Sequence, residues 1–144
     1  MPDFQSSEDQ NQYLFVYGTL MQGLANHDVL ASQGKVDFVS HGTVTGELYN
    51  LGDYPGLCLG DSETNPIVHG ELYLLDDVDT VLEMLDIIEG VSDVRPEQSL
   101  YRREEMNVTI ESETIGAWVY IYNHPVAEGM RIAHGDYRRF LAER

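Results

Sequence analysis

The sequence predicts an α+β fold, a small mixed β-barrel with a few flanking helices. Three observations predict it: most patterned segments are strands, the helical segments are few, and no internal repeat or linker divides the chain. A length of 144 residues suits one domain with one core. A doubly wound parallel sheet is disfavoured, because it would need a helix between successive strands.

The predicted strands follow from apolar runs and alternation. An apolar run over residues 13–17 predicts a short buried strand, and alternating apolar residues over 67–75 predict another. Residues 36–49 predict two segments split by His41-Gly42, residues 57–59 predict a short strand, and residues 101–110 and 114–122 predict a hairpin around Ser112-Glu113. Turn-rich loops are predicted at 50–56, 61–66 and 92–98.

Three helices are predicted. The strongest spans residues 76–88, with an apolar stripe, Asp76 or Asp77 as N-cap, and Gly90 as its end. A short helix over 27–33 would have Asn26 as N-cap and Gly34 as its stop. Residues 135–141 predict a final short helix.

The charge of the chain is strongly negative. Eight Lys and Arg stand against 25 Asp and Glu, which gives a net charge of −17. Such a field repels nucleic acid and anionic membranes, so neither is an expected partner. One Lys against seven Arg suggests a salt-rich cytoplasm such as that of a halophile, although an ordinary acidic protein explains the composition nearly as well.

The first residues and the single cysteine indicate the compartment. Residues 1–12 are polar and acidic, predict a disordered tail before a single domain over 13–144, and lack the pattern of a signal peptide. Cys58 is the only cysteine, which excludes an internal disulfide. The expected location is cytoplasmic.

The turn after the first strand is a candidate binding site. Gly18 lets the chain turn sharply and exposes the backbone of Thr19 and Leu20. Backbone N–H groups without strand partners at such a turn favour an anion, so these residues could form a cradle for a carboxylate or phosphate. The alternative is an ordinary tight turn.

Glu89 is the strongest candidate for acid–base chemistry. It lies at the end of an apolar helix beside Ile87 and Ile88, where desolvation would raise its pKa and suit it to proton transfer near neutral pH. The alternative is an exposed acid at a helix end. Glu83 and Asp86 are weaker candidates, since Glu83 is expected on the wet face and Asp86 is expected to bond locally.

Two motifs in order resemble the γ-glutamylcyclotransferase-like superfamily. Tyr17-Gly18-Thr19-Leu20 follows an apolar strand, and Leu85-Asp86-Ile87-Ile88-Glu89-Gly90 with Tyr101-Arg102-Arg103 is similar to the pattern Leu-Asp-x-x-Glu-Gly…Tyr-x-Arg. The branch of γ-glutamylamine cyclotransferases and AIG2-like proteins looks closest. The resemblance covers about residues 13 to 141, with Tyr137 where the closing motif commonly has Trp.

The resemblance implies a reaction without a cofactor, and the scattered His residues and single Cys predict no metal site. The α-amine of a γ-glutamyl compound would attack its own γ-carbonyl and release 5-oxoproline and an amine, with Glu89 as the general base and acid. The implied partner is a small γ-glutamyl substrate, and the implied assembly is a monomer or weak dimer. The implied substrate-binding residues are Tyr17, Gly18, Thr19, Leu20, Tyr54, Tyr101 and Tyr120.

Several of these roles have structural alternatives. Tyr17 could line a pocket or pack in the core, Tyr101 could be a plain strand aromatic, and Tyr122 competes with Tyr120. The eleven residues between Glu89 and Tyr101 exceed the spacer of many relatives, which would alter the accepted leaving group. The rival functions are a binding module on the same fold and, less favoured, an acidic interaction protein.

Overall fold

The computed structural model describes residues 11–24, 26–32, 36–52, 54–59, 66–91, 95–111 and 113–144. Its strands are β1 (Tyr13–Val16), β2 (Val36–Thr45), β3 (Glu47–Asn50), β4 (Pro55–Cys58), β5 (Ile67–Leu75), β6 (Tyr101–Ile110), β7 (Glu113–Tyr122) and β8 (Arg131–Ile132). Its helices are α2 (His27–Ala31), α3 (Val78–Ile88) and α4 (Tyr137–Ala142), with 3₁₀ turns η1 (Pro96–Gln98) and η2 (Glu128–Met130).

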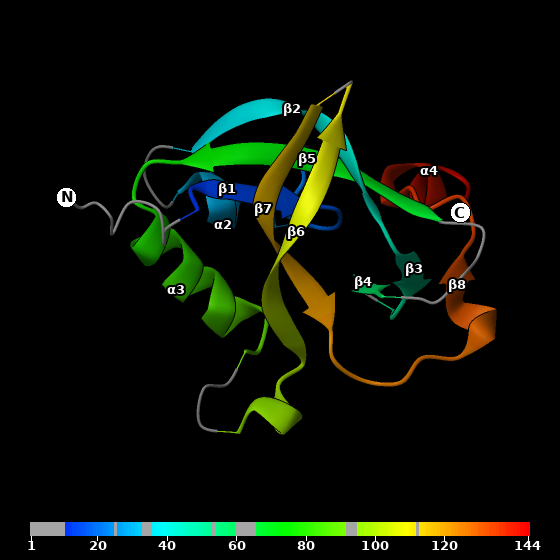
Figure 1. The fold of residues 1–144 in the computed structure, drawn as a ribbon. Helices are drawn as coiled ribbons and strands as arrows, with labels where there is room; N and C mark the ends of the chain where they lie inside the picture. Colours follow the sequence, from blue (N-terminus) through cyan, green and yellow to red (C-terminus); the bar gives the residue numbers. More distant parts are fainter. Residues whose placement is uncertain are drawn as a thin grey trace.

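The strands form a closed barrel and a smaller sheet, which confirms the predicted class. The barrel order is β1-β5-β2-β6-β7, and it closes where β1 runs parallel to β7 at Leu14 and Trp118. The second sheet has the order β4-β3-β8. In Figure 1, α3 lies beside the barrel at one end, whereas α4 lies near β3 and β8 at the other.

The core fills the barrel and extends under α3. Leu14 and Phe15 of β1, Leu72 of β5 and Ile121 of β7 are almost fully buried. The helix contributes four of the five residues of the predicted stripe, since Val78, Val81, Leu82 and Leu85 are buried, whereas Ile88 is 39% exposed. Burial of this stripe fixes α3, and therefore its C-terminal end, against the barrel.

The predicted division of residues 36–49 was wrong in its position. The ladder between β2 and β5 runs through His41 and Gly42, and its only irregularity is a bulge between Phe38 and Ser40. The break between the two strands lies at Gly46 instead, where the Gly46 N–H donates to the Pro66 carbonyl oxygen at 2.9 Å. At that point the chain passes from the barrel to the second sheet. This change of sheet depends on tertiary contacts, so the alternation of apolar and polar residues does not predict it.

Helix α3 begins and ends close to the predicted limits. The Asp77 side chain caps it by accepting from the Thr80 N–H at 3.3 Å. Gly90 follows with φ of +72°, a left-handed conformation that favours glycine after a helix. Asn26 precedes α2 as predicted, but its side chain makes no cap hydrogen bond.

Other differences concern short elements. β4 begins at Pro55, inside the predicted 50–56 loop, and stops before Leu59; η1 lies in the predicted 92–98 loop; and β8 and η2 were not predicted. The predicted tail over 1–10, the Gly34 stop of the first helix and Ser112 of the hairpin lie outside the described residues. Asn11, at the end of the predicted tail, already contacts the barrel, since Trp118 Nε1 donates to its carbonyl oxygen at 2.8 Å.

No helix in the described part of the chain combines the length and apolar character needed to cross a membrane.

Candidate active site

A cavity of about 230 Å³ lies where the end of β1, the end of α3 and the start of β4 meet. Its lining combines the residues of both sequence motifs with apolar side chains from neighbouring segments. The lining residues are Phe15, Val16, Tyr17, Gly18, Thr19, Leu20, Asn26, Tyr54, Pro55, Ile88, Glu89, Leu100, Tyr101 and Tyr120.

Glu89 is the one acidic or basic side chain that lines this cavity among the described residues. It caps the C-terminus of α3, where its N–H donates to the Leu85 carbonyl oxygen at 2.8 Å. No described group donates a hydrogen bond to its carboxylate, and desolvation by burial raises its pKa from 4.5 to about 7. At neutral pH this carboxyl can therefore both accept and release a proton.

The turn of Gly18, Thr19 and Leu20 presents its N–H groups without an acceptor among the described residues. Its carbonyl groups are used. The Gly18 carbonyl oxygen accepts from Met21 at 3.0 Å, and that of Thr19 accepts from the Asn26 N–H at 2.8 Å. With carbonyls turned to the protein and N–H groups unpaired beside a cavity, the turn has the polarity that suits an anion.

Asn26 holds this turn from the other side. Its side-chain Nδ2 donates to Thr19 Oγ1 at 2.9 Å, and its backbone N–H bonds the Thr19 carbonyl oxygen. The neighbouring His27 places Nδ1 2.9 Å from the Leu20 carbonyl oxygen. The start of α2 is thus tied to the turn by side-chain contacts. Sequence reasoning gave Asn26 a capping role and a place in the family motif, but did not place its side chain in the cavity wall.

Gly18 is needed for a packing reason that the sequence did not reveal. A Cβ atom built on Gly18 would lie 2.7 Å from Cγ and 2.9 Å from Cδ of Pro55. Because Gly18 has no side chain, Pro55, the first residue of β4, packs directly against the turn. This contact brings β4 to the cavity.

Tyr17 lines the cavity and also packs in the core. It is 6% exposed, and its hydroxyl donates to the Tyr120 carbonyl oxygen at 2.6 Å and accepts from the Leu57 N–H at 3.0 Å. Burial raises the pKa of this hydroxyl above its usual range, and the nearby Glu89 charge adds to the rise. Both readings of Tyr17 left open by the sequence are therefore realised.

Tyr101 is buried against the same wall. Its hydroxyl donates to the Pro55 carbonyl oxygen at 2.7 Å, so its proton is engaged by β4 and not by the Glu89 carboxylate. Its ring contacts Tyr54 and Tyr122, with ring centroids 6.3 and 5.5 Å away. Tyr54 is 36% exposed at the cavity, whereas Tyr122 does not line it.

Tyr120 is the tyrosine of β7 that reaches the cavity. Its hydroxyl donates to Asp86 Oδ1 at 2.7 Å, and it is 3% exposed. Asp86 had been expected to bond locally, but it bonds across to the barrel, 34 residues along the chain. Glu83 is exposed on α3 and lies away from the cavity lining.

Sequence reasoning missed part of the apolar cavity wall. Phe15 and Val16 were assigned only to a buried strand and Leu100 only to a spacer, whereas Ile88 was already expected beside Glu89. The sequence signal at this end of α3 was the pair Ile87-Ile88: the fold leaves them 72% and 39% exposed, outside the buried stripe, and Ile88 lines the cavity.

Within the described ranges, no group of three or more His, Cys, Asp or Glu side chains could hold a metal ion.

A family model described as gamma-glutamyl cyclotransferase, AIG2-like, matches residues 14–139, which include every segment that lines the cavity. The chain belongs to this family. The match spans both the turn of Gly18 and the Glu89 segment, which confirms the resemblance drawn from those two motifs.

Relatives in this AIG2-like family are similar over most of their length. A Vibrio cholerae protein provisionally named a gamma-glutamylcyclotransferase is 37% identical over 132 residues, covering 86% of this chain and 93% of its own. The gamma-L-glutamyl-butirosin B gamma-glutamyl cyclotransferase of Niallia circulans is 32% identical over 111 residues, covering 76% of this chain and 66% of its own.

Solved structures share the fold. An AIG2-like protein of Mus musculus superimposes with a TM-score of 0.68 at 26% identity, covering 88% of this chain and 87% of that one.

Proposed function

We propose that this protein is a γ-glutamyl cyclotransferase that converts a γ-glutamyl amine or peptide into 5-oxoproline and a free amine, with Glu89 as general base and acid. One observation carries the proposal: a desolvated carboxyl with a pKa of about 7 shares a cavity with the unpaired N–H groups of the Gly18 turn. The first group suits proton transfer, and the second suits an anionic substrate end.

The proton transfers of this reaction need one carboxyl group that accepts and releases protons near neutral pH. The substrate α-ammonium must lose a proton before its nitrogen can attack, and Glu89 takes that proton. The α-nitrogen then forms a bond to the γ-carbonyl carbon, which closes a five-membered ring. Glu89 returns this proton to the leaving nitrogen, and the bond from the γ-carbon to that nitrogen breaks. The ring nitrogen then loses its second proton through Glu89 to the released amine, which departs as an ammonium ion and leaves 5-oxoproline and an ionised Glu89.

The backbone N–H groups of Gly18, Thr19 and Leu20 hold the glutamyl end in this proposal. They would donate hydrogen bonds to its α-carboxylate, and one of them could donate to the oxyanion that develops on the γ-carbonyl. Local donors of this kind also explain how an acidic chain can bind an acidic substrate, because they act at hydrogen-bond distance while the surface charge is screened by salt.

The rival is a binding module that holds a small carboxylate or amide in the same cavity without turnover. Release of 5-oxoproline from γ-glutamyl compounds separates the two. Turnover by the wild type and its loss in Glu89→Gln support the cyclotransferase. Binding of the same compounds without any release would support the module instead.

A further inference from the structure

Three of the four tyrosines that line the cavity, all but the half-exposed Tyr54, donate their hydroxyl protons to the protein. Tyr17 donates to the Tyr120 carbonyl oxygen, Tyr101 donates to the Pro55 carbonyl oxygen, and Tyr120 donates to Asp86. A hydroxyl whose proton is committed can still accept through its free lone pair. The hydroxyl oxygens of these three tyrosines therefore offer acceptors, whereas the Gly18 turn offers donors.

Tyr120 is the hydroxyl placed best to accept from a ligand. The Tyr17 oxygen already accepts from Leu57, and the Tyr101 hydroxyl bonds away into β4. The Tyr120 hydroxyl bonds Asp86, which lies three residues before Glu89 and so close to one helical turn away on α3. Its alternative acceptor, the Leu82 carbonyl oxygen, is 3.5 Å away, and the 2.7 Å contact to Asp86 prevails.

Asp86 is itself fixed by a cation. Arg103 Nε lies 3.1 Å from Asp86 Oδ1, and both side chains are about three-quarters buried. This Nε makes no hydrogen bond to a described group, so the contact is a charge pair that leaves the Tyr120 bond to Asp86 intact. Arg103 and Tyr120 are paired directly across β6 and β7.

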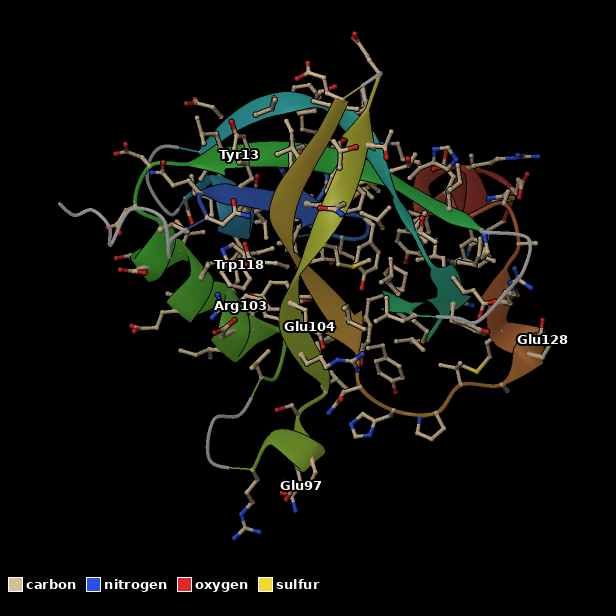
Figure 2. All side chains as sticks on the ribbon, in the orientation of Figure 1. Tyr13, Glu97, Arg103, Glu104, Trp118 and Glu128 are labelled. Atoms are coloured by element: carbon tan, nitrogen blue, oxygen red, sulfur yellow. The ribbon has the colours of Figure 1, made fainter. Side chains whose placement is uncertain are left out.

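Arg103 is also held from its other side. Its guanidinium lies 4.8 Å from the centre of the Trp118 ring, within the range of a cation–π contact. Figure 2 shows Arg103 and Trp118 close together on the side of the barrel next to α3. A series of side-chain contacts therefore leads from the barrel surface to the cavity wall, through Trp118, Arg103, Asp86 and Tyr120.

We propose that Asp86, held by Arg103, positions the Tyr120 hydroxyl as a hydrogen-bond acceptor for the α-ammonium group of the substrate. This inference rests on the proposed function, since it names how the amine end of a γ-glutamyl ligand is recognised. The α-carboxylate lies at the Gly18 turn and the α-ammonium at Tyr120 and Glu89. That arrangement fixes one orientation of the zwitterion, with its side chain leading to the mouth of the cavity.

The test compares two ligands that differ only in the α-amine. γ-Glutamylethylamide carries it, and N-ethylglutaramic acid lacks it. Their dissociation constants are measured by calorimetry in the Glu89→Gln protein, which slows turnover. Added to this background are Asp86→Asn, Arg103→Met and Arg103→Lys, with Glu83→Gln as the control that removes a charge from the exposed face of the same helix.

We expect the parent to bind the amine about tenfold to a hundredfold more tightly, the range for a hydrogen bond to a charged group. Asp86→Asn and Arg103→Met should bring this ratio close to one. Arg103→Lys keeps the charge and should retain much of the preference, and Glu83→Gln should retain all of it. In the otherwise wild-type enzyme, Asp86→Asn should raise KM more than it lowers kcat.

The outcomes separate the two proposals. Binding of both ligands with a ratio unchanged in Asp86→Asn would overturn the positioning role and leave the proposed function standing. Binding of neither ligand to a folded parent would overturn both. Arg103→Lys, which keeps the charge pair, is the control for a loss of helix or of thermal stability in Asp86→Asn. A ratio of the two dissociation constants that falls equally in both variants would also overturn the proposal.

Discussion

Glu89 combines a functional demand with a cost in stability. Its carboxyl is desolvated, so its pKa is about 7 in the folded protein against 4.5 for the unperturbed group. A carboxyl with a raised folded pKa stabilises the fold below the unfolded pKa, and this contribution is lost as the pH rises toward 7. The residue that suits proton transfer therefore destabilises the protein at neutral and alkaline pH.

Replacement of Glu89 by Gln should reverse that cost. We expect the free energy of unfolding of Glu89→Gln relative to wild type to increase by about 2 kcal/mol between pH 5 and pH 8, because only the wild type must bury a charge. Urea denaturation at both pH values measures it. An exposed control, Glu83→Gln, should show no such trend, and a Glu89→Gln difference that is flat with pH would contradict the assigned burial.

Tyr17 should matter for stability as well as for binding. Tyr17→Phe leaves the Tyr120 carbonyl oxygen and the Leu57 N–H unpaired in the core, which should lower the free energy of unfolding by about 3 kcal/mol. Tyr101→Phe removes one bond, to the Pro55 carbonyl oxygen, and should cost less. Equal losses in chemical denaturation of the two variants would argue against the double role of Tyr17.

At the scale of elements, the contact between the β1 turn and β4 shapes the cavity. Gly18→Ala would place a methyl group 2.7 Å from the Pro55 ring, so β4 or the turn must shift. We expect a tenfold or greater fall in kcat/KM together with a lower melting temperature. Gly129→Ala is the matched control, because a Cβ at Gly129 meets nothing within 4 Å. Full activity in Gly18→Ala would show that the turn tolerates the displacement.

Helix α4 is connected to the region of the turn by a buried carboxylate. Glu71 of β5 is 1% exposed and accepts from the Gln22 N–H at 2.9 Å, from the Tyr73 hydroxyl at 2.8 Å and from Arg138 of α4. Arg138→Met should lower the free energy of unfolding by about 3 kcal/mol, because the Glu71 carboxylate stays buried but loses its ion pair with Arg138.

A double-mutant cycle checks this link. Arg138→Met combined with Glu71→Gln should cost less than the sum of the single changes, because the two side chains act as a pair. Additive losses in denaturation experiments would mean that Arg138 stabilises α4 without help from Glu71.

The sequence predicted elements where a local pattern exists. The alternating strand over 67–75 and the capped helix ending at Gly90 agree with β5 and α3. The exit of the chain at Gly46 and the two-residue β8 depend on partners distant in sequence, and no local period marks them. The cavity follows the same rule. The Gly18 turn and Glu89 were found from local sequence and from resemblance, whereas the contribution of Phe15, Val16 and Leu100 to its wall depends on contacts between distant segments.

At the scale of the whole molecule, the net charge of −17 should affect substrate choice. A negative field favours approach of a cationic leaving group over an anionic one, and salt weakens that preference. We expect the ratio of kcat/KM for γ-glutamyl-lysine to that for γ-glutamyl-glutamate to exceed one at low salt and to fall in molar KCl. Equal turnover at low salt would contradict this expectation.

A second measurement, at the same two salt concentrations, tests the halophile hypothesis. If the acidic surface is an adaptation to a salt-rich cytoplasm, circular dichroism should show less secondary structure at low salt than in molar KCl. An unchanged spectrum would leave the halophile hypothesis without support.

The most direct test of the central claim is 5-oxoproline release from a panel of γ-glutamyl amines and peptides, with wild type and Glu89→Gln compared at low and high salt. The account predicts release by the wild type and a loss of at least a hundredfold in Glu89→Gln, the scale of general acid–base catalysis. Release that persists in Glu89→Gln, or no release from any substrate by the folded wild type, would contradict it.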